Sequence, residues 1–161
     1  MCSPDMISFY NRLIIMPLFS RIPFDKKQIE NAIAELEKQT SAELRVYIER
    51  HLPKNTENLD RALTIFNQLE MHKTVARNAV LIYIAHKDQQ CFILGDQGIH
   101  QFVGDEFWHK QCQSMISYFK EKQYTIGIVS VIEQIGEELS IHFPIQPDDA
   151  NELPNEVIIN D

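Results

Sequence analysis

Residues able to bind a ligand occur in three short segments that lie far apart in the chain. Glu43 and Asp96 carry carboxylates, Arg77 and Asn78 supply a guanidinium and an amide, and Gly98 leaves its backbone open to close approach. Two carboxylates with amide and backbone oxygens suit a hard cation such as Ca²⁺ or Mg²⁺. The Arg77 guanidinium could hold an anionic group, such as a phosphate, through paired hydrogen bonds. A structural interpretation is also open, in which Arg77 pairs with Glu43 or Asp96 and ties the segments together.

The distribution of glycine singles out one of these segments. The chain has five glycines and none before position 95, whereas Gly95, Gly98 and Gly104 follow one another closely. Glycine is favoured where the backbone adopts a positive φ or where another group approaches closely. We therefore expect a specially shaped loop at residues 95–98.

Histidine and cysteine give weaker signals. The spacing of His100, His109 and Cys112 fits no standard zinc pattern, and no Ser-His-Asp or Cys-His arrangement can be assembled from the sequence. Cys91 and Cys112 are expected to be small buried apolar side chains in a reducing compartment. His86 is expected to lie in solvent, in a turn.

Apolar residues at helical spacing predict four helices. The first follows Asp25, whose side chain is expected to cap it together with Gln28 in a capping box. The others are expected over about residues 59–69, after a cap at Asp105, and after a cap near Thr125.

Three strands lie between these helices. Alternation at residues 44–48 predicts a strand with one buried face, and the apolar run at 79–85 predicts a central strand covered on both faces. A turn then returns the chain as an antiparallel strand over 91–94. The order α-β-α-β-β-α-α predicts an α/β three-layer sandwich, with a small mixed sheet and helices on both faces.

Chain direction decides whether the candidate residues can meet. A right-handed crossover makes the first two strands parallel, so both begin at one end of the sheet. The antiparallel third strand ends at that same end. Residues 40–43, 77–78 and 95–98 should therefore converge on one end of the sheet and form a single site.

Length and charge limit the classes of function. The 161 residues are 44% hydrophobic and 24% charged, which is typical of one ordinary globular domain. We expect this domain at residues 25–144, between an N-terminal leader at 1–24 and an acidic tail at 145–161. The formal net charge of -8 argues against nucleic-acid binding, which needs a basic surface.

The two ends of the chain carry further expectations. The apolar stretch at residues 6–19 contains Asn11, Arg12 and Pro17, so it is too short and interrupted for a membrane-spanning helix. It also lacks the features of a signal peptide, and Met16 could be the true start. In the tail, residues 157–159 are expected either to add an edge strand or to remain mobile.

Several of these segments together resemble the TPM domain, the family that includes thylakoid-lumen phosphatase-like proteins, a photosystem II repair factor and MOLO-type receptor accessory proteins. The resemblance extends over about residues 25–157 and is carried by residues 40–44, 77–83, 95–99, 133–136 and 151–154. It implies a small α/β sandwich, and it links the chain to acid phosphatase activity and to calcium binding. Many members have a signal peptide and a C-terminal membrane helix. This chain looks like a short, soluble bacterial form, for which we expect a cytoplasmic location.

Three functions follow from these observations. The first is a binding or accessory module, with a divalent-cation or protein-partner site at one sheet end. The alternative is a metal-dependent acid phosphatase acting on phosphomonoesters, with Glu43 and Asp96 around the cation and Arg77 on the phosphate of a small phosphorylated ligand. The third is a structural domain that acts through its helices or its acidic tail.

Overall fold

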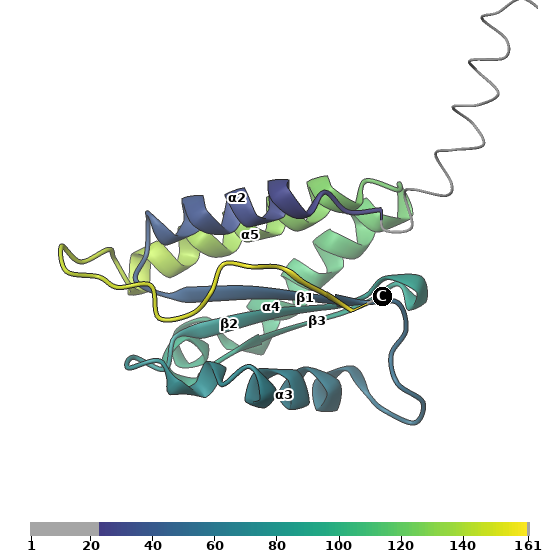
Figure 1. Ribbon diagram of the computed structural model, residues 1–161, viewed down its shortest axis with the longest axis horizontal. Helices are drawn as coiled ribbons and strands as arrows, with labels where there is room; N and C mark the ends of the chain where they lie inside the picture. Colours follow the sequence, from purple (N-terminus) through teal and green to yellow (C-terminus); the bar gives the residue numbers. More distant parts are fainter. Residues whose placement is uncertain (1–22, 161) are drawn as a thin grey trace, which may run out of the picture.

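The apolar run after Arg77 and Asn78 forms the centre of the sheet in the computed structural model, which describes residues 23–160 (Figure 1). In it, β2 (Ala79–Ala85) is buried along its whole length. It pairs in parallel with β1 (Glu43–Glu49) and antiparallel with β3 (Gln90–Gly95), as predicted. A further short strand, β4 (Ile158–Asn160), pairs in parallel with β1 and completes the order β3-β2-β1-β4.

Three helices cover one face of this sheet, and the predicted three-layer α/β sandwich is confirmed (Figure 1). They are α2 (Lys26–Glu37), α4 (Gln97–Lys120) and α5 (Tyr124–His142). Asp25 caps α2 as predicted, because its Oδ1 accepts from the Gln28 backbone nitrogen at 3.1 Å. On this face the buried strand residues are aliphatic: Leu44, Val46, Ile48, Val80, Ile82, Ile84 and Ile93.

The opposite face carries α3 (Asn58–Gln68), which is followed by a 3₁₀ turn at Met71–Lys73 (Figure 1). A second 3₁₀ turn, at His86–Asp88, joins β2 to β3. On this face an ion pair joins β1 to α3. The Arg61 guanidinium of α3 binds both oxygens of Glu49, through Nε at 2.8 Å and Nη2 at 2.9 Å. The Tyr83 hydroxyl donates to the same carboxylate at 2.5 Å. Arg61 therefore compensates a carboxylate whose side chain is only 7% exposed.

The predicted glycine loop is wrong, because the chain passes directly from β3 into α4. Asp96 is the N-cap and accepts from the Gln97 backbone nitrogen at 2.8 Å, so the expected cap at Asp105 is also wrong. Of the glycines, only Gly104 has a positive φ, 75°, where α4 is kinked. Asp105 comes directly after this kink.

Two further predictions differ from the structure. Thr125 does not cap α5; its hydroxyl accepts from the Asp25 backbone nitrogen at 2.9 Å and thereby joins the start of α2 to that of α5. His86 is buried rather than solvated. Its ring lies edge-on to Phe24, with 5.4 Å between centroids, because the turn folds under the start of α2.

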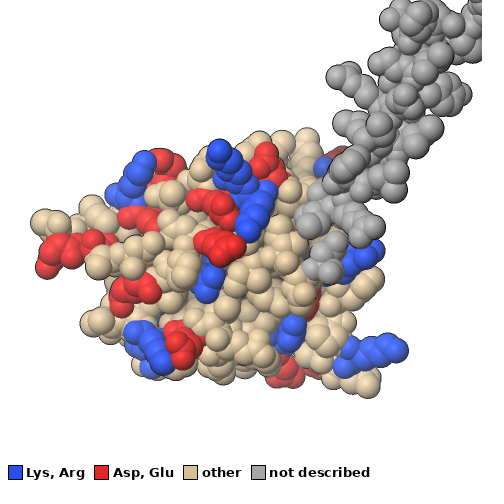
Figure 2. Space-filling model, in the orientation of Figure 1, with Lys and Arg blue, Asp and Glu red and all other residues tan. Residues whose placement is uncertain are grey.

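The acidic C-terminal segment packs against the domain and runs back along β1 to β4 (Figure 1). The Val157 nitrogen donates to Glu30 at 3.1 Å, and Lys26 lies 3.2 Å from Glu156. Acidic side chains gather at the end of the molecule where this segment protrudes, whereas the rest of the visible face carries both acidic and basic side chains (Figure 2).

The leader and Met16 lie outside the described residues, apart from Pro23 and the core residue Phe24. Within residues 23–160, no helix combines the length and apolarity that crossing a membrane requires.

Candidate functional site

The three segments predicted to converge do meet at one end of the sheet. Glu43 pairs with Ala79 across β1 and β2, and Val80 pairs with Gly95 across β2 and β3. The Asp96 backbone nitrogen also donates to the Ala79 carbonyl at 2.9 Å. The parallel crossover and the following hairpin therefore bring these segments together, as their chain direction requires.

Arg77 and Asp96 form a paired ion contact at this end. Arg77 Nε lies 2.7 Å from Asp96 Oδ2, and Nη2 lies 3.0 Å from Oδ1. This contact raises the pKa of the Arg77 guanidinium. Arg77 has a left-handed φ of 51°, and the Asp96 carboxylate also caps α4. Both Asp96 oxygens are thus engaged, as in the structural interpretation of this pair.

Gly98 lets the turn before β2 approach the start of α4. Its nitrogen donates to the Arg77 carbonyl at 2.8 Å. A Cβ at this position would lie 2.1 Å from the Ala76 carbonyl oxygen and 2.5 Å from that of Arg77. The glycine is therefore required for close approach, and no positive φ is involved.

Asn78 is held beneath this turn, with 1% of its surface exposed. Its Nδ2 reaches the Ser41 carbonyl at 3.5 Å, which links the start of β2 to the segment before β1. The Asn78 Oδ1 atom is buried without a hydrogen-bond partner. An unpaired buried oxygen is costly, so this amide could contribute to a ligand site.

Glu43 lies apart from Asp96, because β2 separates β1 from β3. Two strand spacings put their backbones roughly 10 Å apart. Glu43 instead lines a cavity of about 240 Å³ between the end of α2, the start of β1 and the C-terminal segment. Its polar lining residues are Glu37, Lys38, Thr40, Glu43, Asp149, Asn151 and Asn155.

Glu37 and Glu43 hydrogen-bond to each other in this cavity, and each has one buried oxygen with no donor from another residue. Glu43 is 3% exposed. Its Oε1 accepts from the Glu152 backbone nitrogen at 2.8 Å, but its Oε2 is buried without a partner. The Glu37 Oε1 atom is buried without a partner too. Lys38, the basic residue of the lining, has its Nζ on Glu35 at 2.7 Å.

Burial and mutual repulsion keep these carboxyls from ionising together. Burial raises the pKa of Glu43 to about 8, and the nearby charge of Glu37 adds to the rise. The pKa of Glu37 is also raised, chiefly by burial and further by Asp149. At neutral pH the pair therefore retains a proton that a cation could replace.

The stability of the cation-free protein should fall as the pH rises from about 5 to about 8. Folded Glu43 keeps its proton up to a pKa of about 8, whereas the unfolded chain releases it near the ordinary value of 4.5. Between these values the folded state binds more protons, so raising the pH favours unfolding. We expect urea denaturation in chelator to show a loss of about 2–4 kcal/mol across this window. Glu43→Gln should flatten the profile, and an equally steep loss in the variant would contradict this explanation.

The cavity does not contain a full set of side-chain metal ligands. Nowhere in residues 23–160 do three or more His, Cys, Asp or Glu side chains form a ligand cluster. A cation here would need amide, backbone or water oxygens besides the carboxylates, a mixture that Ca²⁺ accepts. The orphaned Glu37 and Glu43 oxygens and the Asn155 amide fit such a set.

Sequence reasoning missed Glu37 and the residues that the C-terminal segment contributes. Glu37 is the last residue of α2, and nothing in the neighbouring sequence marks it as part of a site. Asp149 and Asn155 come more than a hundred residues after Glu43, and they reach the cavity only because β4 pairs with β1. The one available signal was that residues 40–44 and 151–154 both belong to the family resemblance.

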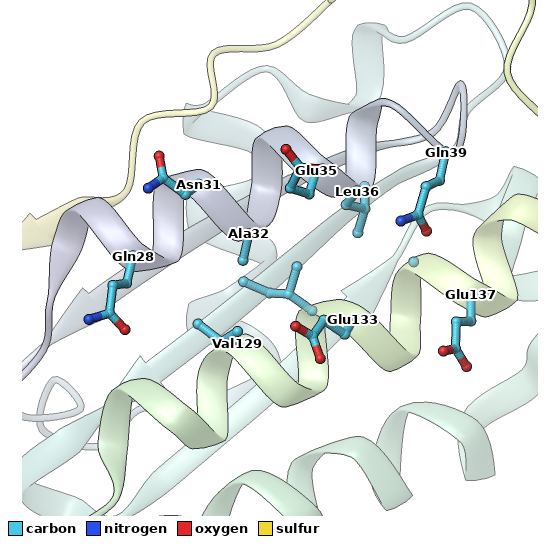
Figure 3. Close-up of a pocket in the computed structure, with 11 residues that line it drawn as sticks. Gln28, Asn31, Ala32, Glu35, Leu36, Gln39, Val129, Glu133 and Glu137 are labelled. Atoms are coloured by element: carbon cyan, nitrogen blue, oxygen red, sulfur yellow. The ribbon is translucent and has the colours of Figure 1, made fainter.

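A second hollow lies between α2 and α5 on the outer surface (Figure 3). It has a volume of about 510 Å³, and Figure 3 shows polar side chains from both helices along it, such as Gln28 of α2 and Glu133 of α5. Gly136 lets the helices approach here, since a Cβ there would lie 3.2 Å from the Leu36 side chain. The carboxylates of this groove, Glu35, Glu133 and Glu137, lie on its open rim, unlike those of the Glu43 cavity.

Comparison with known proteins agrees with this architecture. A search of curated proteins gave no match. The NMR structure of BA42 from the psychrophilic bacterium Bizionia argentinensis is 38% identical and has a TM-score of 0.77, with 84% of this chain and 92% of that chain covered. An N-terminal domain from P. gingivalis shares the fold at 11% identity and a TM-score of 0.62, covering 76% and 82% of the two chains.

The fold extends to a third solved structure, the N-terminal domain of cg2496 from Corynebacterium glutamicum. Its identity is 11% and its TM-score 0.54, with 69% of this chain and 68% of that chain covered. The model of the TPM domain matches residues 22–138, which include α2 to α4, most of α5 and all of the sheet except β4. The chain therefore belongs to the TPM domain family.

Proposed function

We propose that this TPM domain is a binding or accessory module whose Glu43 cavity takes a divalent cation, Ca²⁺ or Mg²⁺. The observation that carries this proposal is the contact between the half-buried Glu37 and the buried Glu43, two carboxyls that share a hydrogen bond and a proton in one cavity. A cation would replace the shared proton and bind an oxygen of each carboxylate. Asp149 and Asn155 lie in the same lining and would supply further oxygens.

In this proposal Glu43 remains a ligand of the cation, whereas Asp96 does not. Both Asp96 oxygens already bind Arg77, so a cation there would have to compete with a guanidinium. The C-terminal segment forms one wall of the Glu43 cavity, and its Glu152 nitrogen binds Glu43 directly. Cation binding would therefore order the surface over β1 that this segment builds. Such an ordered surface is what a protein partner would recognise.

Adding millimolar Ca²⁺ should raise the thermal unfolding midpoint of the wild-type protein. A cation at a hundredfold its Kd stabilises the folded state by about 2.7 kcal/mol, or about 5–10 °C for a chain of this length. Glu43→Gln keeps the shape of the side chain but cannot ionise to bind a cation, and should weaken binding at least about tenfold. Calorimetry in buffers of different ionisation enthalpy should also report release of about one proton at neutral pH.

Two variants make this measurement decisive. Glu106→Gln removes an equal charge from a side chain that is 82% exposed, and should bind Ca²⁺ like the wild type. Asp96→Asn breaks the Arg77 contact, and should lower the unfolding midpoint while leaving the Ca²⁺-induced rise intact. Loss of that rise in Asp96→Asn but not in Glu43→Gln would mean that the cation binds at Asp96 and not at Glu43. No rise in the wild type up to millimolar Ca²⁺ or Mg²⁺ would remove the cation site altogether.

The same samples test the enzymatic alternative. A metal-dependent phosphatase would release phosphate from a phosphomonoester at acid or neutral pH, with the cation as Lewis acid and Arg77 on the phosphate. Cation-dependent phosphate release that disappears in both Glu43→Gln and Arg77→Ala would mean that the protein is an enzyme and not an accessory module. Binding of Ca²⁺ without turnover supports the module.

A further inference from the structure

The open edge of the sheet at β3 borders a hollow that is larger than the two already described. It has a volume of about 1160 Å³ and follows β3, with α4 beside it. Its lining is largely apolar along β3, whereas α4 contributes Asp105 and Glu106 directly after the kink and Lys120 at its end. The lining residues that matter here are Cys91, Ile93, Trp108, Cys112 and Ile116.

Cys91 and Cys112 meet in this groove from different elements. Cys91 lies near the start of β3, opposite Ile84 of β2, and Cys112 lies in the part of α4 that follows the kink at Gly104. Their Sγ atoms are 2.7 Å apart, whereas a disulfide bond would place them at about 2.05 Å. Both thiols are free and both side chains are only partly buried. The pair therefore needs very little movement to form a bond, and small reagents can reach it.

We propose that Cys91 and Cys112 form a reversible intramolecular disulfide by exchange with a small disulfide such as oxidised glutathione. One cysteine thiolate attacks a glutathione sulfur, which forms a mixed disulfide and releases one glutathione thiolate. The second cysteine thiolate then attacks the protein sulfur of that bond and releases the second glutathione. Together the two protein thiols lose two electrons and two protons, and the small disulfide is reduced to two thiols.

The bond would fasten α4 to the edge of the sheet. It closes a loop from residue 91 to residue 112, which includes the start of α4 and the kink at Gly104. Closing a loop of this length restricts the unfolded chain, and should raise the thermal unfolding midpoint by about 5–10 °C. Burial raises the pKa of the Cys91 thiol, so exchange should accelerate as the pH rises.

The test uses the full chain, equilibrated with mixtures of reduced and oxidised glutathione at about pH 8, where thiolates are more abundant. The samples are quenched with acid, denatured, alkylated and mapped by mass spectrometry. We expect a linked peptide containing Cys91 and Cys112, a mass loss of about 2 Da, and a rise in the unfolding midpoint that dithiothreitol reverses. Separate alkylation or glutathionylation of the two cysteines at every ratio would overturn the proposal.

Cysteine variants control for the third cysteine of the chain, Cys2. Cys2→Ser should still form the linked peptide, whereas Cys91→Ser and Cys112→Ser should show no rise in the unfolding midpoint upon oxidation. A bond that involves Cys2 in place of either groove cysteine would also overturn the proposal. If a groove variant fails to fold, the peptide map of Cys2→Ser still decides, because it keeps both groove cysteines.

Discussion

Arg61→Ala should lower the free energy of unfolding by about 3–5 kcal/mol, a large fraction of the 5–15 kcal/mol typical of a folded domain. The substitution leaves the Glu49 carboxylate buried without its ion partner. Glu49 then keeps only the Tyr83 hydroxyl, which satisfies one of its oxygens. The change also removes a cation that lies 5.9 Å from the centre of the Tyr47 ring.

Urea denaturation at neutral pH measures this loss, and a double-mutant cycle identifies its cause. Glu49→Gln should reduce the cost of Arg61→Ala, because the remaining side chain is then neutral. Lys27→Ala, on the exposed surface of α2, removes the same charge and should change stability by no more than about 0.5 kcal/mol. An Arg61→Ala cost that stays the same in the Glu49→Gln background would mean that packing, and not the buried carboxylate, determines it.

Gly98→Ala should cost about 3 kcal/mol or more, at the upper end of the range for overpacking. The added methyl group would meet the Ala76 and Arg77 carbonyl oxygens, which belong to the backbone and cannot rotate away. Either α4 or the turn before β2 has to move. That movement breaks the hydrogen bond from Gly98 to Arg77 and strains the Arg77–Asp96 contact.

Gly136→Ala is the matched control for this experiment, since it makes the same chemical change within α5. Its Cβ would meet only the Leu36 side chain at 3.2–3.7 Å, and alanine gains about 1 kcal/mol over glycine in a helix. We therefore expect Gly136→Ala to be close to neutral. Equal losses in both variants would show that the crowded carbonyls near Gly98 are not the reason for its cost.

The fold was predictable because its elements have strong local patterns. The unbroken apolar run at 79–85 could only be a central strand, and the stripe after Asp25 carries its own cap. Parallel pairing of β1 and β2 then followed from the handedness of the crossover. The glycine cluster was misread because Gly98 serves close packing against carbonyl oxygens, which composition does not distinguish from a loop.

The candidate site was predictable only in part, for a physical reason. Residues that follow strand ends can be placed from strand order, which brought Arg77 together with Asp96. The neighbours of Glu43 come from the end of α2 and from the C-terminal segment, and neither position depends on strand order in the central sheet. The contact between the Cys91 and Cys112 sulfur atoms depends on how α4 packs against β3, and the sequence pattern does not predict that packing.

Because β1 is apolar on one face and charged on the other, its pairing cannot shift by one residue without burying the wrong side chains. Leu44, Val46 and Ile48 face the helical core, while Arg45 and Glu49 are buried on the α3 side. A slip by one residue would exchange the two sets and drive ionised groups into an aliphatic interior. The buried charges of β1 therefore favour the observed alignment with β2 over one shifted by a single residue.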